Sequence, residues 1–378
     1  MAITRIGNLA IADTRGVNFR NIIINGDMSI AQRGTSFTGL SNGDSQYTLD
    51  RFKFDEGGAT TGELTISQST DVPSGQGFTK SVKFDCTTAD AVLASDDVIY
   101  FNQRIEGQNL QYLNYGTSSA KKLALSFWVK SNISGSVFSA LLYNEDNARI
   151  VNTNFFLSAA NTWEKKTFII NGDTVSGFND DANRSLWLNF NLGVGSAWSD
   201  GTVSTTWTDY RGRDETDSNW GAGVEANLLS STSNELYITG IQLEADAVTD
   251  FEFLPYDVNK ERCRRYFQKT YIDGVDPGTT TNYGMVSTAR IQSTVTNRPT
   301  NVFFRPELRA SPTVTTYSLV GTSGSVSDVG TSGGSHSRDE AVSISGSVSQ
   351  QGLPYLVSVA GLTAGDGFCF HYTADAEL

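Results

Sequence analysis

Two segments decide the fold of this chain: NIIINGDMSIAQRGT at Asn21–Thr35, and ELYITGIQLEADAVTDFEFLPYDVNKERCRRYFQK at Glu235–Lys269. We expect them to form the opening and closing strands of one β-sandwich. No catalytic signature stands beside either segment. The function therefore has to be sought on surfaces and not in a motif that marks an enzyme active site.

The chain between these segments alternates with the two-residue period of a β-strand. Every second residue is apolar in LALSFWVK at Leu123–Lys130 and again in LWLNFNL at Leu186–Leu192. Further strands are expected at Val137–Tyr143 and Thr167–Ile170, with turn signals between them. Strands this short and numerous predict an all-β fold, a jelly-roll β-sandwich.

The composition of the 378-residue chain agrees with short strands joined by turns. Hydrophobic residues make up 38% and charged residues 18%, and there are 36 Gly against 7 Pro. The formal net charge of −13 repels phosphate backbones, so we expect no nucleic acid as a partner. The same charge is compatible with binding of a divalent cation.

Cysteines and the amino-terminal residues exclude several other classes. Cys86, Cys263 and Cys369 are far apart and form no CxxC pair, so neither a zinc knuckle nor a disulfide framework is expected. Residues 1–20 lack the apolar core of a secretory signal, and no run approaches the ~18 apolar residues of a membrane span. We expect synthesis in the cytoplasm and no membrane insertion.

Changes in amino-acid composition and pattern divide the chain into four regions. Residues 1–20 are interpreted as an arm that attaches the protein to a neighbour, and residues 21–257 as the sandwich. Residues 258–270 are predicted to form a linking helix, capped by Asp257 and rich in Lys and Arg. Its apolar stripe is Cys263, Tyr266 and Phe267.

Residues 271–378 are predicted to form a smaller β-rich domain at the carboxyl-terminal end. Large apolar residues thin out here, and Gly, Ser, Thr and Val replace them. GTSGSVSDVGTSGG at Gly321–Gly334 is interpreted as a low-complexity loop. Expected strands are Gly284–Ile291, Thr300–Phe304, Thr313–Leu319, Ala341–Val348, Tyr355–Val359 and Gly367–Tyr372.

Several phrases occur along the chain in a characteristic order: INGDMSIAQRGTSF (Ile24–Phe37), YTLDRF (Tyr47–Phe52), IEGQNLQYLNYGTSSAKKLALSFWVKS (Ile105–Ser131), LWLNFNLGVGS (Leu186–Ser196) and FEFLPYDVNKERCRRYFQK (Phe251–Lys269). As a set they resemble tail-fibre-like virion proteins of tailed bacteriophages, over roughly residues 17–270. The resemblance implies an appendage on the outside of the virion, attached through its amino-terminal arm and assembled as a homotrimer.

The same phrases resemble jelly-roll carbohydrate-binding modules, and that resemblance implies a calcium site. Such modules begin with an Asn-Gly-Asp/Glu strand, here Asn25 to Asp27, and end with a strand that supplies an acidic ligand. This chain has Gly240 where an Asp is expected, with Glu244 four residues later. Calcium is therefore the only cofactor suggested, with Asn25, Asp27 and Glu244 as candidate ligands. The alternative is that Asn25–Asp27 forms a simple turn or bulge.

Candidate glycan-binding residues lie on the polar faces of the predicted strands. Sugar binding needs flat aromatic surfaces with amides or carboxylates beside them. Trp187, Asn189 and Asn191 share one such face, and Trp128 lies on another; if the two strands belong to one sheet, they line a groove. Trp207 adds a candidate from the Trp-rich segment Ser196–Gly223. Alternatively, that segment covers Trp128 and Trp187, and both merely extend the core.

Signatures of catalysis are weak throughout the chain. Glycoside hydrolysis needs two carboxylates about 5–9.5 Å apart, but pairs such as Glu145/Asp146 and Asp180/Asp181 lie in turn signals where acids are ordinary. A formal GxSxG match at Gly330–Gly334 lacks the strand–turn–helix context of a nucleophile elbow. Only two histidines exist. We expect that the protein is not an enzyme.

The sequence thus favours a structural phage virion protein, a tail fibre or similar appendage that adheres to glycans of the bacterial surface. Its expected partners are other virion proteins, further copies of itself and that glycan. One alternative is a head fibre or capsid-decoration protein that stabilises the capsid. A third, from another class, is a polysaccharide depolymerase.

Overall fold

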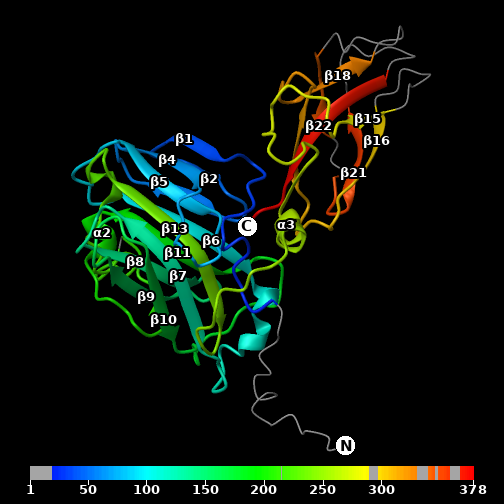
Figure 1. Cartoon of the computed structure of the whole chain (residues 1–378). Coiled ribbons are helices and arrows are strands. Elements are labelled where there is room, and N and C mark those ends of the chain that lie inside the picture. Colours follow the sequence, from blue (N-terminus) through cyan, green and yellow to red (C-terminus); the bar gives the residue numbers. More distant parts are fainter. Residues whose placement is uncertain (1–18, 214, 289–296, 330–338, 345–347, 358–366) are drawn as a thin grey trace, which may run out of the picture.

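The protein consists of a large and a small β-rich lobe (Figure 1). This computed structural model describes residues 19–213, 215–288, 297–329, 339–344, 348–357 and 367–378. The arm expected at residues 1–20 lies almost entirely outside the described residues. Nearly all regular structure is strand, which confirms the all-β prediction. In the described part of the chain, no helix is long and apolar enough to cross a membrane.

The large lobe is a sandwich of two antiparallel sheets. The first sheet, in spatial order, is β1 (Ser36–Leu40), β4 (Glu63–Ser69), β5 (Ser81–Thr88), β13 (Glu235–Ala245), β7 (Leu123–Ser131) and β10 (Glu164–Ile170). The second is β12 (Thr208–Asp209), β9 (Arg149–Phe156), β8 (Val137–Asn144), β11 (Arg184–Val194), β6 (Val98–Glu106), β3 (Lys53–Gly57) and β2 (Ser45–Tyr47). The non-consecutive order is that of a jelly roll.

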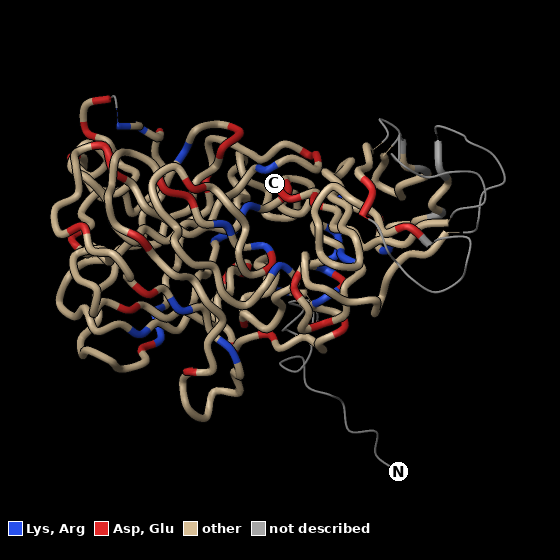
Figure 2. Tube along the Cα trace, turned by 90° about the horizontal axis from the view of Figure 1, so that it is seen from above, with Lys and Arg blue, Asp and Glu red and all other residues tan. Residues whose placement is uncertain are grey.

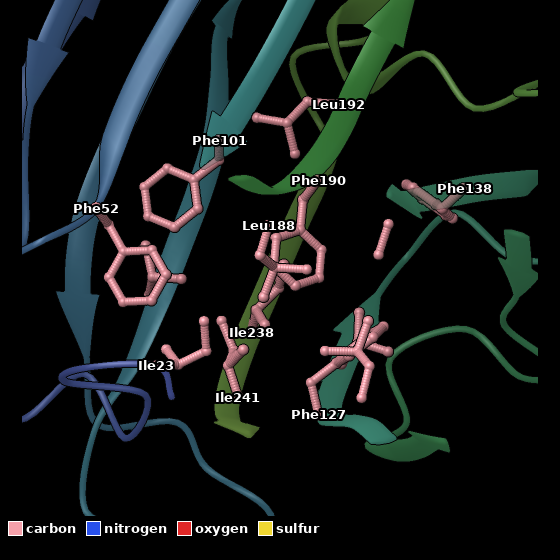
Figure 3. Close-up of a cluster of buried hydrophobic side chains, with 14 of the residues drawn as sticks. Ile23, Phe52, Phe101, Phe127, Phe138, Leu188, Phe190, Leu192, Ile238 and Ile241 are labelled. Atoms are coloured by element: carbon pink, nitrogen blue, oxygen red, sulfur yellow. The ribbon is translucent and has the colours of Figure 1, made fainter. Parts of the chain in front are cut away.

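The core between the two sheets is built from the apolar faces of the alternating strands (Figure 3). Phe127 of β7 meets Phe190 of β11 edge-on across the sandwich, with ring centroids 5.1 Å apart. Phe52 stacks on Phe101 of β6 at 5.1 Å. Each fully buried aromatic ring contributes about 2–3 kcal/mol through the hydrophobic effect. The period-two prediction for β7 and β11 is therefore confirmed in type and in face.

The first deciding segment is not a strand, and that prediction was wrong. Asn21–Thr35 has no strand hydrogen-bond pattern, and Asn25 and Met28 adopt left-handed conformations with φ of 62° and 58°. The segment instead fills the bulge in β13: Ile241 N donates to Gly26 O at 2.9 Å. A Cβ on Gly26 would lie 2.0 Å from Ile241 O, so only glycine permits this approach.

Gly240 has a local reason to be glycine. It lies at the same bulge with φ of 62°, and a Cβ there would lie 2.5 Å from the ring of Phe78. An Asp at this position, which the resemblance led us to expect, would be strained and would clash with the ring.

The linking helix is shorter than predicted and begins earlier. α3 spans Tyr256–Arg264 after Pro255, and Asp257 lies in its first turn without capping it. The predicted end at residue 270 was wrong because the following residues form β14 (Phe267–Lys269), which pairs with β22 (Gly367–Asp375). Cys263 and Tyr266 do bury the expected stripe, against Ile24 and Ile30.

The small lobe has two sheets with their own apolar cluster. β14, β22, β18 (Ser325–Val329), β19 (Asp339–Ala341), β15 (Val286–Ser287) and β17 (Thr313–Tyr317) form one sheet, and β16 (Asn297–Phe303), β21 (Gly352–Val357) and β20 (Ser343–Ile344) form the other. β18 corrects the prediction of a loop over Gly321–Gly334, because Val326 is fully buried within a sheet. Short helical turns elsewhere are η1 (Gly107–Asn109), η2 (Gln111–Leu113), η3 (Leu228–Ser230) and α2 (Ser196–Ser199).

The last described residues return to the sandwich and lie between the two lobes beside α3 (Figure 1). Glu377 forms ion pairs with Arg33 and Arg51, both on loops of the sandwich. Leu378 packs against the cluster that includes Ile24 and Tyr266. The junction of the lobes is thus held by buried charge pairs as well as by α3.

Candidate functional site

The outer face of the second sheet carries a hollow of about 500 Å³. Five of its strands and the Trp-rich segment line it. We call it the aromatic groove, and its lining residues are Ser45, Asp55, Glu56, Gly57, Val98, Tyr100, Tyr143, Glu145, Trp187, Trp198, Tyr210 and Trp220. Its volume is within the roughly 300–1,000 Å³ typical of small-ligand sites.

The aromatic side chains of the groove pack edge to face around Trp220. Its ring centroid lies 5.5 Å from that of Tyr100, 5.7 Å from that of Tyr143 and 5.8 Å from that of Tyr210. Trp220 itself is buried, whereas the surrounding rings are half-buried. The buried ring therefore orients the partly exposed ones, which present apolar surface to the groove.

Trp187 is fixed by polar contacts as well as by ring packing. Its indole N–H donates to Glu145 Oε2 at 2.8 Å, and Arg184 forms an ion pair with Glu145 Oε1 at 2.8 Å. The guanidinium of Arg104 lies 4.1 Å from the centre of the Trp187 ring, a cation–π contact. A tryptophan restrained on this many sides loses little conformational freedom when it binds a ligand.

The carboxylate of Asp55 forms the polar edge of the groove on β3. Ser45 Oγ donates to it at 2.6 Å and Asn102 Nδ2 at 2.8 Å, and Lys53 and Arg104 form ion pairs with it. A carboxylate held by so many donors has a fixed direction. It can accept hydrogen bonds from ligand hydroxyls only at its remaining lone pairs.

Glu56 differs from its neighbour Asp55 in both direction and charge. Successive strand residues point to opposite faces, and the Glu56 carboxyl oxygens are buried without a hydrogen-bond partner among the described residues. Burial, together with the negative charges of Asp44, Asp97 and Asp90, raises the pKa of Glu56 to about 8. This carboxyl is therefore mostly neutral at pH 7, and both of its oxygens are buried.

The Trp-rich segment is held over the sheet by three sets of contacts. Asn152 of β9 donates to Asn219 O at 3.0 Å and accepts from Ser204 N at 3.0 Å. Arg149 bridges the buried Asp173 to Asp209 of β12. The indole N–H of Trp198 donates to the backbone oxygen of Asp96 at 2.9 Å. The covering segment, residues 196–223, is thus fixed to the sandwich by specific hydrogen bonds and ion pairs.

The predicted glycan-binding residues divide between the groove and its support. Trp187 lines the groove as expected. Asn189 and Asn191 lie on the same face of β11 but are buried, at 0% and 1% exposure. Asn191 Nδ2 donates to Trp220 O at 3.2 Å and Asn189 Nδ2 to Asn191 Oδ1 at 2.9 Å. These amides therefore position Trp220 and cannot contact a ligand.

The other two predicted tryptophans do not line the groove. Trp128 lies on β7 in the first sheet, on the opposite side of the sandwich from Trp187, so the condition that both strands share one sheet is not met. Trp207 is buried in the sandwich core, edge-on to Tyr115 at 5.7 Å. A two-residue period identifies the outward face of a strand but not the sheet to which the strand belongs.

Sequence reasoning missed most of the groove. Tyr143 lies directly opposite Trp187 across the β8–β11 pair, and Tyr100 lies opposite Asn191 across the β6–β11 pair. Both tyrosines alternate with apolar residues along their own strands, so their outward direction was readable. Their proximity to Trp187 was not readable, because it depends on strand register.

The three predicted calcium ligands have separate structural roles. Asn25 hydrogen-bonds the backbone of Ile30, Asp27 accepts from Ser29 and Asn259, and the buried Glu244 accepts from Thr249. Burial raises the pKa of Asp27 despite those bonds. Among the residues that the structure describes, no group of three or more His, Cys, Asp and Glu side chains could hold a metal ion.

No family model matches the chain, and no curated protein matches it. Among solved structures it is similar to a putative sugar-binding protein from Bacteroides thetaiotaomicron, with 13% identity and a TM-score of 0.33 over 60% of this chain and 100% of that chain. A family 11 carbohydrate-binding module of a Clostridium thermocellum cellulase has 9% identity and a TM-score of 0.26, over 56% and 97% of the two chains.

The enzymatically active domain of tailspike protein 4 of bacteriophage CBA120 is also similar, with 11% identity and a TM-score of 0.31 over 60% of this chain. The match spans about a fifth of that tailspike chain, 21%.

Proposed function

We propose that this protein binds a glycan in the aromatic groove and belongs to an appendage on the outside of a bacteriophage virion. The observation that carries the glycan proposal is the groove itself, where half-buried rings of Tyr100, Tyr143 and Trp187 lie beside the carboxylates of Asp55 and Glu145. Pyranose rings offer C–H faces that stack on aromatic rings, while their hydroxyls donate to carboxylates. The proposed place on a virion is supported by the resemblance of residues 17–270 to tail-fibre-like proteins of tailed bacteriophages.

A non-catalytic role suits the carboxyl groups of the groove better than hydrolysis does. A glycosidase needs one protonated acid and one free carboxylate that both reach the scissile bond. Asp55 and Glu145 are each engaged by cations, and the neutral carboxyl of Glu56 is buried. The depolymerase alternative predicts new reducing ends when purified protein is incubated with capsule or lipopolysaccharide. Their appearance would contradict our proposal.

Replacing Trp187 by Ala tests the glycan proposal. A panel of neutral oligosaccharides would be titrated against the wild-type chain, with tryptophan fluorescence as the readout because three Trp line the groove. We expect binding to weaken on the order of 10- to 100-fold in the variant, since one stacked ring contributes about 1–3 kcal/mol.

The chain offers a matched control on its other face. Trp128→Ala removes a half-buried outward tryptophan from the first sheet and should leave glycan affinity unchanged. Circular dichroism would establish that both variants fold. If Trp187→Ala folds and binds every wild-type ligand with wild-type affinity, the groove is not the glycan site.

The place of the protein on the virion needs a separate measurement. A cryo-EM map of the assembled particle would locate residues 1–20, the proposed attachment arm, and would count the copies in each appendage. We expect a trimer whose arms contact tail proteins. Arms bound to the major capsid protein would favour the capsid-decoration alternative instead.

A further inference from the structure

A second cavity, of about 620 Å³, lies on the sandwich next to α3, on the side where the two lobes meet. Four of its lining residues are arginines: Arg51, Arg104, Arg262 and Arg265. None of the described lining residues is Asp or Glu, although the whole chain has a net charge of −13. We call it the arginine cavity. Lys and Arg gather around this junction, as Figure 2 shows.

Three of the four arginines have acidic partners behind the cavity wall. Arg265 forms two hydrogen bonds with Glu106, at 2.9 and 2.8 Å. Arg51 pairs with Glu377, and Arg104 pairs with Asp55 at 3.3 Å. Their charges are largely compensated within the protein.

Arg262 is the exception. It lies on α3, and its Nη2 donates to the backbone oxygen of Asn21 at 3.1 Å. No carboxylate of the described residues lies within ion-pair distance of it, and Glu252 influences it only from further away. Burial lowers the pKa of Arg262, which means that its charge is incompletely solvated. A guanidinium carries five N–H donors, so most of its donors remain for a ligand.

We propose that the arginine cavity binds the anionic group of an acidic saccharide, a carboxylate or a phosphate ester, with Arg262 as the principal contact. The planar fork of donors on an arginine matches either group with two parallel hydrogen bonds. This site is separate from the aromatic groove and does not depend on the function proposed for that groove.

The remaining lining residues favour a sugar over a bare ion. The cavity is far larger than a phosphate or sulfate requires and falls in the range of small-molecule sites. Tyr112, with 46% of its surface exposed, and Asn109 lie at the same cavity and offer an aromatic face and an amide. The groove, by contrast, is bordered by the carboxylates of Asp55 and Glu145, and its described lining residues include no Arg or Lys that could pair with an acidic sugar.

The test uses the full chain and four probes: D-glucuronic acid, glucose 6-phosphate, glucose as the neutral match, and inorganic phosphate. Ligand-observed NMR titration would give each Kd. Binding of either acidic sugar supports the proposal. The sugar that binds more tightly identifies the anionic group that the cavity prefers, a carboxylate or a phosphate ester. We expect Arg262→Gln to weaken that binding on the order of tenfold or more, the typical loss of a charge-assisted pair.

Arg264→Gln is the matched control, because Arg264 lies on the same helix, pairs with Glu261 and does not line the cavity. It should leave the Kd unchanged. If Arg262→Gln fails to fold, Tyr112→Ala removes an exposed lining residue and should weaken binding severalfold. The proposal is overturned if neither acidic sugar binds the wild type. It is also overturned if Arg262→Gln and Tyr112→Ala, both folded, bind the acidic sugar with wild-type Kd, or if inorganic phosphate binds as tightly as the sugars.

Discussion

The two outer faces of the sandwich are built from strands with the same two-residue alternation, but their surfaces differ in shape and in the residues exposed. Trp128 on β7 and Trp187 on β11 each point outward from a strand whose alternate residues fill the core. Around Trp187 the second sheet carries a ring of aromatic residues and a hollow of about 500 Å³. Near Trp128 the first sheet carries Lys130 and Tyr237, with the ammonium 4.3 Å from the ring centre.

The difference comes from a segment far away in the sequence. Residues 196–223 bring Trp198, Tyr210 and Trp220 over the second sheet only. An outward tryptophan thus becomes part of a concave site when a covering segment builds walls around it. A strand without such a cover keeps its tryptophan on an open face.

The largest effect is expected from the ion pair that anchors the covering segment to the second sheet. Arg149→Met removes the partner of Asp173, a carboxylate that is only 2% exposed. We expect a loss of about 4 kcal/mol in the free energy of unfolding, because a buried charge is left uncompensated. Urea denaturation monitored by circular dichroism measures this loss, and fluorescence would report the loosening of Trp220.

A second substitution distinguishes lost charge compensation from lost packing. Adding Asp173→Asn to Arg149→Met removes the orphaned charge, so part of the stability should return. A double variant no more stable than Arg149→Met alone would show that packing of the arginine stem, and not its charge, anchors the segment.

The sequence predicts the sheets far better than it predicts the site. Alternation in Leu123–Lys130 and Leu186–Leu192 was sufficient for both strands, since each has one apolar face that the core must bury. The same rule fails for Asn21–Thr35, where the apolar run Ile22–Ile24 is buried by a looped path against the bulge of β13. Hydrophobicity requires burial but does not dictate the hydrogen-bond pattern.

The groove depends on facts that no local pattern contains. Trp187 and Tyr143 are opposite each other because of one particular register, and a shift by one residue would separate them. Trp207 and Trp220 lie in the same polar segment, yet one is buried in the core and the other holds the groove together. Only the tertiary path of the segment decides between these positions.

The pH dependence of stability tests whether the two sheets also differ in how they bury acidic side chains. Glu56, on β3 of the second sheet, has its pKa raised to about 8 by burial and by Asp44, Asp97 and Asp90. Since the folded state holds this proton more tightly than the unfolded state does, the contribution of Glu56 to stability is fully present below about pH 4.5 and is lost as the pH rises to 8. Glu56→Gln should remove a pH-dependent loss of about 3 kcal/mol between pH 5 and pH 8.

The matching acid on the first sheet should behave in the opposite way. Glu235 is partly exposed, and a hydrogen bond from Lys83 lowers its pKa. Its stabilisation is present at neutral pH and disappears as the pH falls through its folded pKa. Chemical denaturation across pH 4–9 compares Glu56→Gln with Glu235→Gln. A wild-type stability that does not fall between pH 5 and 8 would contradict the neutral state assigned to Glu56.

The smallest effect is expected on the open face of the first sheet. Lys130 pairs with Asp71, whose side chain is 44% exposed, and Trp163 also donates to that carboxylate at 3.0 Å. Lys130→Met should change the free energy of unfolding by less than about 1 kcal/mol, because water screens the pair and the aliphatic stem still covers Tyr237. Denaturation in low and high salt measures it. A loss as large as that of Arg149→Met would contradict the exposed state assigned to this pair.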